Sequence, residues 1–203
     1  MLDVDVTVAV ATFGRRGWVR LALERAIPSA TAQGVPVVHV HSETLAQARN
    51  QALARVQTEW VCHLDADDEL EPGYFDAMAA ASADVRAPAV RYVHDGTIAP
   101  AALPVVAGHT HPCTADCLPA GNWLIIGSLV RAQLVRDVGG WRDYTWSEDW
   151  DVWLRCHLAG ATFAAVPAAV YRAHVSTDSR NRRVPQHIRQ AVHDQIHRDN
   201  YPP

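Results

Sequence analysis

Three carboxylates follow a short apolar run within four positions. The run is VCHL (61–64), and Asp65, Asp67 and Asp68 come directly after it. Carboxylates this close repel one another unless a cation or hydrogen-bond donors offset their charge. A hard divalent ion meets that need and would bridge to a phosphate-bearing substrate. The alternative is a solvated acidic turn that caps the following helix, and this stretch alone leaves both interpretations open.

Alternating strand and helix patterns surround the acidic stretch. Three strand–helix pairs in a row favour an α/β fold with a mostly parallel, Rossmann-like central sheet and helices on both faces. Ligands of open α/β sheets bind outside the carboxyl ends of the strands, which is where the three carboxylates stand. The expected elements are a strand over 5–13, a helix over 18–27 ending at Pro28, a strand over 35–42, a helix from the capping box of Thr44 and Gln47 to about Val56, a strand over 59–64 and a helix over 71–81.

The second half of the chain has a less regular pattern. No internal repeat and no domain boundary is visible in it, so one domain is expected. The expected elements are a strand within 83–94, a loop rich in Pro, Ala and Gly over 97–121, a strand over 122–130, a short helix over 131–138, a helix over 147–160, one or two strands over 161–174 and an amphipathic helix over 187–200.

Composition excludes several classes of protein. The 203 residues are 49% hydrophobic, enough for one sizeable core, and the net charge of −4 does not fit a nucleic-acid binder. No apolar run approaches the roughly 18 residues of a membrane span, and the acidic N-terminal segment does not fit a signal peptide. We expect a cytoplasmic protein without a disulfide framework, although the chain has four cysteines.

Several segments, in order, resemble the family 2 glycosyltransferases, which have the GT-A fold. The resemblance runs from about Val6 to Ser176. Its pieces are VAVATFGR, ARNQAL (48–53), LDADDELEPGYF with its D-x-D motif, GSLVRAQLVRDVGGW, SEDWDVWLR and VYRAHVS. Each piece is weak evidence, but their order is specific. The resemblance implies a metal-dependent, inverting transfer of a sugar from a nucleotide-sugar to an acceptor hydroxyl.

The resemblance implies roles for the donor-side residues. Asp65 would hold the nucleoside, Asp67 would bind the metal that bridges the two phosphates, and His174 would complete the metal site or touch the diphosphate. Mg²⁺ or Mn²⁺ is expected, and the imidazole favours Mn²⁺. Asp68 is expected to be structural. Other candidates for binding the nucleotide are Thr12, Phe13, Arg15, Glu43, Arg49 and Arg172.

The resemblance also implies an acceptor side. Asp149 would be the base that takes the proton of the acceptor hydroxyl, at a helix N-terminus that favours its ionised form. Plain first-turn capping by Glu148 and Asp149 is the alternative. Trp141 and Trp146 would offer a stacking platform for a sugar, with Glu148 beside them, and core packing is the alternative for the rings. The acceptor is left open among a glycan, a lipid-linked sugar, a protein and a small molecule.

Two departures from the family pattern stand out. One βα unit before the ARN helix is expected to be missing, and Glu43 would replace the family's base-contacting Asp, which leaves the nucleotide base open. A UDP-sugar is favoured as the donor, with GDP- and dTDP-sugars as the alternatives. His109, His111, Cys113 and Cys117 have spacings that allow a structural zinc, or simply a loop with two reduced cysteines.

These expectations divide the chain into a GT-A domain over 1–180 and a C-terminal linker and helix over 181–203. Within the domain, 1–94 would form the nucleotide-binding half and 95–180 the acceptor half. The alternatives to a glycosyltransferase are a sugar-nucleotide pyrophosphorylase and a non-catalytic module that binds a sugar nucleotide or is stabilised by zinc. FGRRGW (13–18) is a poor match to the Gly-rich loop that a pyrophosphorylase needs.

Overall fold

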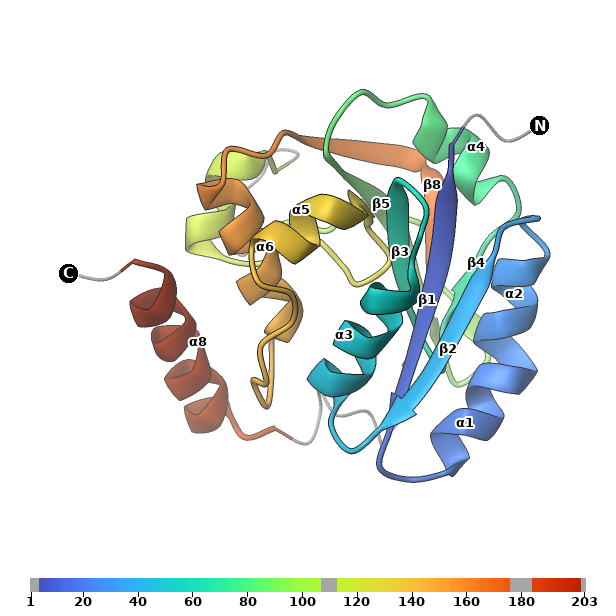
Figure 1. Cartoon of the computed structure of the whole chain (residues 1–203), viewed down its shortest axis with the longest axis horizontal. Helices are drawn as coiled ribbons and strands as arrows, with labels where there is room; N and C mark the ends of the chain where they lie inside the picture. Colours follow the sequence, from blue (N-terminus) through green and yellow to red (C-terminus); the bar gives the residue numbers. More distant parts are fainter. Residues whose placement is uncertain (1–3, 107–112, 176–183, 202–203) are drawn as a thin grey trace.

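A single mixed sheet runs through the middle of the molecule (Figure 1). The computed structural model describes residues 4–106, 113–175 and 184–201. Within these residues the sheet has eight strands in the order β2-β1-β3-β7-β5-β8-β4, and β6 pairs with β5 off that path. The strands are β1 (Val6–Phe13), β2 (Val37–Ser42), β3 (Trp60–Asp65), β4 (Glu69–Leu70), β5 (Val85–His94), β6 (Thr97–Ile98), β7 (Leu129–Arg131) and β8 (Phe163–Val175).

The long strand pairings are parallel and the short ones are antiparallel. β1 runs parallel to β2 and β3, and β5 runs parallel to β8. β7 is short and joins β3 to β5 in antiparallel fashion. The predicted α/β class with a mostly parallel central sheet is therefore confirmed. Among the described residues β2 forms the edge of the sheet, with β1 as its partner.

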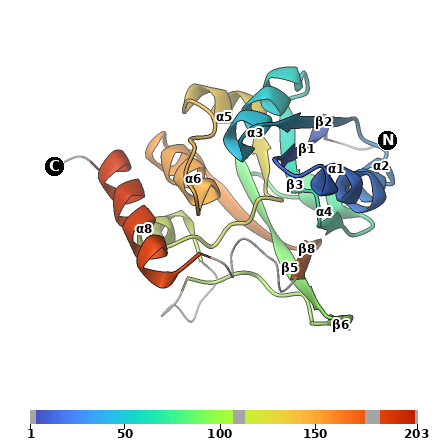
Figure 2. The ribbon, with the colours of Figure 1, turned by 90° about the horizontal axis from the view of Figure 1, so that it is seen from below.

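Helices cover both faces of the sheet (Figures 1 and 2). α3, α5 and α6 lie on one side, and α1, α2 and α4 lie on the other. None of the described helices is long and apolar enough to cross a bilayer. The helices are α1 (Gly17–Leu21), the π-helical η1 (Ala22–Ala26), α2 (Ile27–Thr31), α3 (Leu45–Arg55), α4 (Tyr74–Ala79), the 3-10 helix η2 (Ala115–Ala120), α5 (Ala132–Asp137), α6 (Glu148–Leu158) and α8 (Gln186–Asn200).

The first helix does not end at Pro28, so that prediction was wrong. Proline removes one N–H and crowds the carbonyl four residues earlier, which normally interrupts a helix. Here the π-helical turn η1 widens the helix just before the proline, and the chain continues as α2 to Thr31. This extra length keeps Ser29 and Thr31 in a helix instead of a loop.

The strand predicted over 122–130 is also wrong for most of its length, because only Leu129–Arg131 pair as β7. The Leu124 N–H donates to the Asn122 side chain, and the Ser128 N–H donates to the Ile125 carbonyl. These local bonds use backbone groups that a sheet ladder would need. Trp123 and Leu124 are nevertheless buried, which explains the apolar pattern.

Candidate active site

The acidic turn after β3 is tied to β8 through Asp68. The Asp68 carboxylate is buried and accepts the Tyr171 hydroxyl at 2.7 Å and the His174 N–H at 2.8 Å. Burial raises the pKa of Asp68 well above its usual range, and the negative charges of Asp67 and Asp65 raise it further. Asp68 therefore positions the turn, as expected from the sequence, and its two carboxylate oxygens already accept bonds from Tyr171 and His174, although the residue lines two cavities.

Three side chains of the first helical segment and the turn after it hold the same acidic turn from the other side. They are Arg25 of η1, Ser29 of α2 and Gln33, which lies in the turn that follows α2. Each bonds to backbone groups of 67–74, which fixes the path of the turn. The bonds are Arg25 Nη1 to the Asp67 carbonyl (2.6 Å), Leu70 N–H to Ser29 Oγ (3.2 Å), Gln33 Nε2 to the Glu71 carbonyl (3.1 Å) and Tyr74 N–H to Gln33 Oε1 (3.1 Å).

Asp67 and His174 line the same two cavities, one of about 210 Å³ and one of about 950 Å³. The His174 Nε2 atom lies 2.6 Å from Glu69 Oε2. If Nε2 carries the proton it donates to Glu69, and Nδ1 is then the nitrogen with a lone pair for an ion. The described residues contain no group of three or more His, Cys, Asp and Glu that could hold a metal. Two protein ligands fit Mg²⁺ or Mn²⁺, which usually take further oxygens from substrate phosphates and water.

Arg49 connects the donor side to the start of α6. Its buried guanidinium donates to Asp65 Oδ1 at 2.9 Å and to Glu148 Oε1 at 2.7 Å. The guanidinium also lies 4.6 Å from the centroid of the Trp141 ring. Arg49 thus forms a salt bridge to the acidic turn, and this contact fixes the side chain of Asp65.

Asp149 stands in the first turn of α6. The residue before this helix, Ser147, has a left-handed backbone with φ of 56°, and it turns the chain sharply into α6. Asp149 Oδ2 accepts the Asn122 amide at 2.9 Å, and Oδ1 accepts the Trp150 N–H at 2.9 Å. Burial raises the pKa of Asp149 to about 6, and the adjacent Glu148 charge also raises it, while Arg49 opposes the rise. A carboxylate in this state is ionised at neutral pH and basic enough to accept a proton.

One cavity of about 660 Å³ joins the two sides of the site. Asp65 and Arg49 line it on the side of the sheet, and Glu148 and Asp149 line it at the start of α6. Trp146 lies on its wall beside two residues of α8, Arg189 and His193. The Arg189 guanidinium lies 5.7 Å from the Trp146 ring centroid. No sequence motif marks Arg189 or His193, so sequence reasoning did not predict that α8 reaches this cavity.

Only some of the other residues predicted to bind the nucleotide line a cavity. Thr12 and Phe13 line the cavity of about 210 Å³, and Arg15 lines the one of about 950 Å³ beside Asp67. Glu43 is exposed and does not line these cavities. Arg172 forms ion pairs with Glu71 at 3.1 Å and with Glu69 at 3.6 Å, so these two carboxylates offset its positive charge.

Trp141 does not offer a stacking platform, so that prediction needs correction. Its side chain is buried, with an exposed fraction of 3%, and it makes edge contacts with His63 and Trp153. The Arg49 guanidinium covers one face of the ring. A sugar has no access to a ring enclosed in this way, so Trp141 belongs to the core and Trp146 is the accessible candidate.

At the carboxyl ends of β1 and β2, one hydroxyl lies between two histidines. The Thr12 Oγ1 atom is 3.0 Å from His39 Nε2 and 3.1 Å from His41 Nδ1. Burial lowers the pKa of His39, and the neighbouring His41 lowers it further. Burial therefore favours the neutral form of His39, and the Thr12 hydroxyl can donate to one ring and accept from the other.

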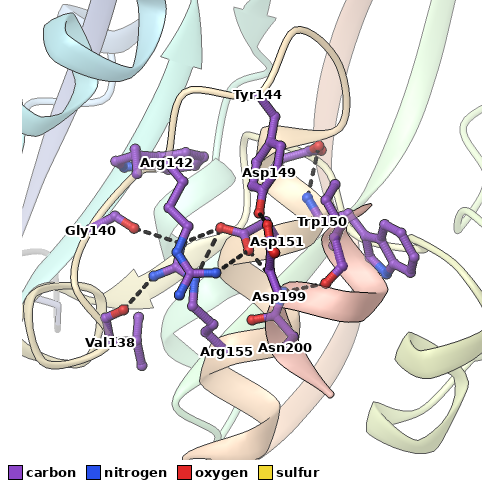
Figure 3. Close-up of polar contacts among 12 residues, drawn as sticks. Val138, Gly140, Arg142, Tyr144, Asp149, Trp150, Asp151, Arg155, Asp199 and Asn200 are labelled. Atoms are coloured by element: carbon purple, nitrogen blue, oxygen red, sulfur yellow. Dashed lines mark hydrogen bonds and ion pairs between the residues drawn. The ribbon is translucent and has the colours of Figure 1, made fainter. Parts of the chain in front are cut away.

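The third carboxylate of SEDWD has a different role from the other two. Asp151 is fully buried, and Figure 3 shows it held from three directions. Arg155 of α6 donates to Oδ2 at 3.0 Å, Arg142 of the preceding loop lies 3.2 Å from Oδ1, and Asn200 of α8 donates to Oδ1 at 2.9 Å. Asp151 thus anchors α6 to both neighbours, and sequence reasoning missed it.

The structure describes only two of the four possible zinc ligands. His109 and His111 lie outside the described residues. Cys113 is buried, and its sulfur accepts the Val106 N–H at 3.3 Å, while Cys117 is half-buried. The zinc site stays a prediction.

The comparisons with solved structures identify proteins of similar fold. The 1-349 fragment of S. aureus TarS in complex with UDP-GlcNAc matches with 16% identity and a TM-score of 0.69, over 97% of this chain and 71% of that one. A structure titled as S. aureus TarS matches with 18% identity and a TM-score of 0.66, over 95% of this chain and 39% of that one. At such identity the likeness shows the fold, and this chain spans well under half of that second structure.

Family models match the sequence itself. The model described as glycosyl transferase family 2 matches residues 21–97, and the model described as glycosyl transferase family group 2 matches residues 60–193. No curated protein gives a significant match. The second model covers well over half of the chain, including the acidic turn, Asp149 and His174, and on this ground the chain belongs to the glycosyltransferases of family 2.

Proposed function

We propose that this chain transfers a sugar from a nucleoside-diphosphate sugar to an acceptor hydroxyl, with inversion at the anomeric carbon. The observation that carries the proposal is the cavity of about 660 Å³ with Asp65 and Arg49 on one wall and Asp149 on another. A donor held at the carboxyl end of β3 and an acceptor held at the start of α6 would meet inside it. Membership of family 2 supports the same reaction class.

Asp149 is the proposed base. The acceptor hydroxyl gives its proton to the Asp149 carboxylate as its oxygen attacks the anomeric carbon. The bond from that carbon to the diphosphate oxygen breaks at the same time, and its electron pair leaves with the diphosphate. A single displacement of this kind inverts the anomeric centre. The pKa of Asp149, raised by burial to about 6, suits a base that works near neutral pH.

Asp67 and His174 are the proposed ligands of Mn²⁺ or Mg²⁺. A bound divalent ion would offset the negative charge that builds up on the leaving diphosphate. Glu69, 2.6 Å from His174, orients the imidazole for this role. Arg15 lines the same cavity as Asp67 and supplies positive charge for the phosphates.

A UDP-sugar is the favoured donor. The support is the S. aureus TarS structure of similar fold, which is titled as a complex with UDP-GlcNAc. Its low identity makes this a guide only to the class of nucleotide, so GDP- and dTDP-sugars remain in the test. Thr12 and Phe13 would line the base and ribose pocket.

Trp146 and Glu148 are proposed to lie on the acceptor side. Trp146 shares the cavity with Asp149, and α8 contributes Arg189 and His193 to the same wall. We therefore propose that the acceptor half, drawn at 95–180 from sequence, also includes α8. The residues of 1–94 would bind the nucleotide.

Calorimetric titration tests the donor site. UDP, GDP and dTDP are added in turn to the full chain, with and without Mn²⁺, and the titrations are repeated on Asp67→Ala. We expect Mn²⁺-dependent binding of one nucleotide that is lost in the variant. Asp76→Ala, which changes an exposed carboxylate of α4, is the matched control and should bind as the wild type does. Absence of binding of all three nucleotides with metal present would exclude the donor site.

Donor turnover separates the enzyme from a binding module. Release of UDP from the donor, with water or a sugar alcohol as acceptor, is compared in the wild type and Asp149→Asn. Binding in both proteins and turnover in neither would favour a sugar-nucleotide sensor. Formation of a sugar nucleotide from a sugar phosphate and a nucleoside triphosphate would favour a pyrophosphorylase.

A further inference from the structure

The side chain of Asn122 lies directly against the proposed base. Its Nδ2 atom donates to Asp149 Oδ2 at 2.9 Å, and both residues line the cavity of about 660 Å³. Asn122 belongs to the segment between η2 and β7 and is distant from α6 in the sequence. A specific side-chain contact therefore joins two separate segments at the atom that the reaction uses.

The orientation of the Asn122 amide is fixed by a second bond. The Leu124 N–H donates to Asn122 Oδ1 at 3.0 Å, so the oxygen of the amide faces the backbone. The NH₂ group must then face Asp149, because a reversed amide would place two acceptors against each other and lose both bonds. The local turn that prevents a strand over 122–128 thus also sets the orientation of the Asn122 amide.

Both oxygens of the Asp149 carboxylate have a donor. Asn122 serves Oδ2, and the Trp150 N–H serves Oδ1 at 2.9 Å. Together they fix the plane of the carboxylate, and each oxygen keeps a further lone pair for an incoming hydroxyl proton. Asn122 achieves this without adding a charge to the cavity.

The charged and titratable groups around Asp149 come from four helices and strands and from the acidic turn. Glu148 of α6 is a like charge next to it, and Arg49 of α3 is the opposing positive charge. The others on the cavity wall are Asp65 of β3, Asp68 of the acidic turn, and Arg189 and His193 of α8. Arg49 is already shared between Asp65 and Glu148, so the neutral amide of Asn122 is the donor given to Asp149 alone.

We propose that Asn122 is a positioning residue that orients Asp149 toward the acceptor and favours its ionised form. The proposal rests on the proposed role of Asp149 as base. A hydrogen bond to a carboxylate stabilises the charged state over the protonated one, and removal of the bond makes the carboxylate more easily protonated.

Carboxylate titration by NMR tests this without a substrate. The full chain is labelled with ¹³C-aspartate, and the Asp149 signal is assigned by its absence in Asp149→Asn. In Asn122→Ala we expect the pKa of Asp149 to rise by roughly one unit, since a bond to a charged group is worth that much or more. In Asn122→Asp, which keeps the size of the side chain, we expect a larger rise, because a second negative charge faces the first.

Asn200→Ala is the matched control. Asn200 also donates its amide to an aspartate of α6, at 2.9 Å, but that aspartate is Asp151. The Asp149 titration should therefore stay as in the wild type. An unchanged pKa of Asp149 in both Asn122 variants, or an equal shift in Asn200→Ala, would overturn the proposal.

Turnover distinguishes this proposal from the proposed function. The acidic limb of the pH–rate profile should move upward in Asn122→Ala by the same amount as the NMR titration. If the pKa of Asp149 shifts in Asn122→Ala but Asp149→Asn is fully active, then Asn122 does act on Asp149 and Asp149 is not the base. A merely structural role of Asn122 would lower the melting temperature and leave both pH profiles where they were.

Discussion

Arg49 and Glu148 form a buried ion pair across 99 residues of sequence, with Nη1 and Oε1 2.7 Å apart. The side chains of both are almost fully enclosed, with exposed fractions of 2% and 4%. The pair joins the helix that precedes the acidic strand to the helix that carries the proposed base. This contact therefore joins the two sides of the cavity directly.

Removal of Arg49 should destabilise the protein strongly. Arg49→Gln removes the guanidinium of a buried ion pair with Glu148, and breaking such a pair costs about 3–5 kcal/mol in the free energy of unfolding. Urea denaturation measures the change. Arg20→Gln, which removes an exposed pair with Glu24 at 3.8 Å, is the control and should cost at most about 1 kcal/mol. Similar losses in the two variants would contradict this view of the site.

Asp149→Asn should lose activity and gain stability at neutral pH. Loss of a general base lowers turnover by roughly 100- to 10,000-fold. In the wild type, burial raises the pKa of Asp149 from 3.8 to about 6. The unfolded chain therefore releases this proton at lower pH than the folded chain, and stability falls as pH rises from 3.8 to about 6. The asparagine does not ionise, so its advantage is full above that window and vanishes below it.

The same substitution two residues later should have the opposite effect on stability. Asp151→Asn weakens the bonds to Arg155 and Arg142, so this variant should unfold at lower urea concentration than the wild type at pH 7.5. Thermal and urea unfolding of both variants at pH 4 and pH 7.5 give the comparison. A loss of stability in Asp149→Asn at pH 7.5 would show that the ionised carboxylate of Asp149 does not destabilise the folded protein.

Arg25 should control metal-dependent binding without contacting the metal. Arg25→Met removes the bond to the Asp67 carbonyl, and the turn that presents the Asp67 carboxylate becomes less ordered. We expect Mn²⁺-dependent nucleotide affinity to fall by roughly 10-fold or more, in the range typical of residues that support metal ligands. Arg16→Met, on the same helical segment and exposed, should bind as the wild type does. Calorimetry of the two variants measures the difference.

Gly127 should not tolerate a methyl group. A Cβ atom there would lie 2.1 Å from the Tyr171 ring, and this ring carries the hydroxyl that holds Asp68. Gly127→Ala should cost about 1–3 kcal/mol or more by overpacking and should also weaken nucleotide binding. Gly17→Ala, where nothing lies within 4 Å of the added atom, is the control. Equal stability of the two variants would mean that Tyr171 moves aside freely.

Patterns with a regular period predicted the fold well. β1, α3 and β3 follow from alternation, a capping box and a continuous apolar run. The predictions failed where a local bond competes with the pattern, as at Asn122, or where a wider helical turn accommodates a proline. Strands of two or three residues, such as β4 and β7, are too short to have a period, and only the folded sheet defines them.

The site was predictable only in part, for a related reason. Asp67, Asp149 and His174 lie in short segments that resemble family motifs. In the structure, Asp67 and His174 line the same two cavities, and Asp149 lines a third. Arg25, Asn122 and Asp151 act through single contacts to residues far away in the sequence. Such contacts produce no pattern of spacing in the sequence, so these residues cannot be selected before the fold is known.

The contact between His39 and Thr12 indicates which part of the protein should unfold locally first in acid. Acidification protonates His39, and the charged ring can then no longer accept a hydrogen bond from the Thr12 hydroxyl. His39 has a lowered pKa, so its share of the stability is present above pH 6.5 and declines below it. Because β2 is bound to the sheet only through β1 in the described chain, local opening at mildly acidic pH should begin at this strand. Its amide protons would exchange with solvent earlier than those of the central strands.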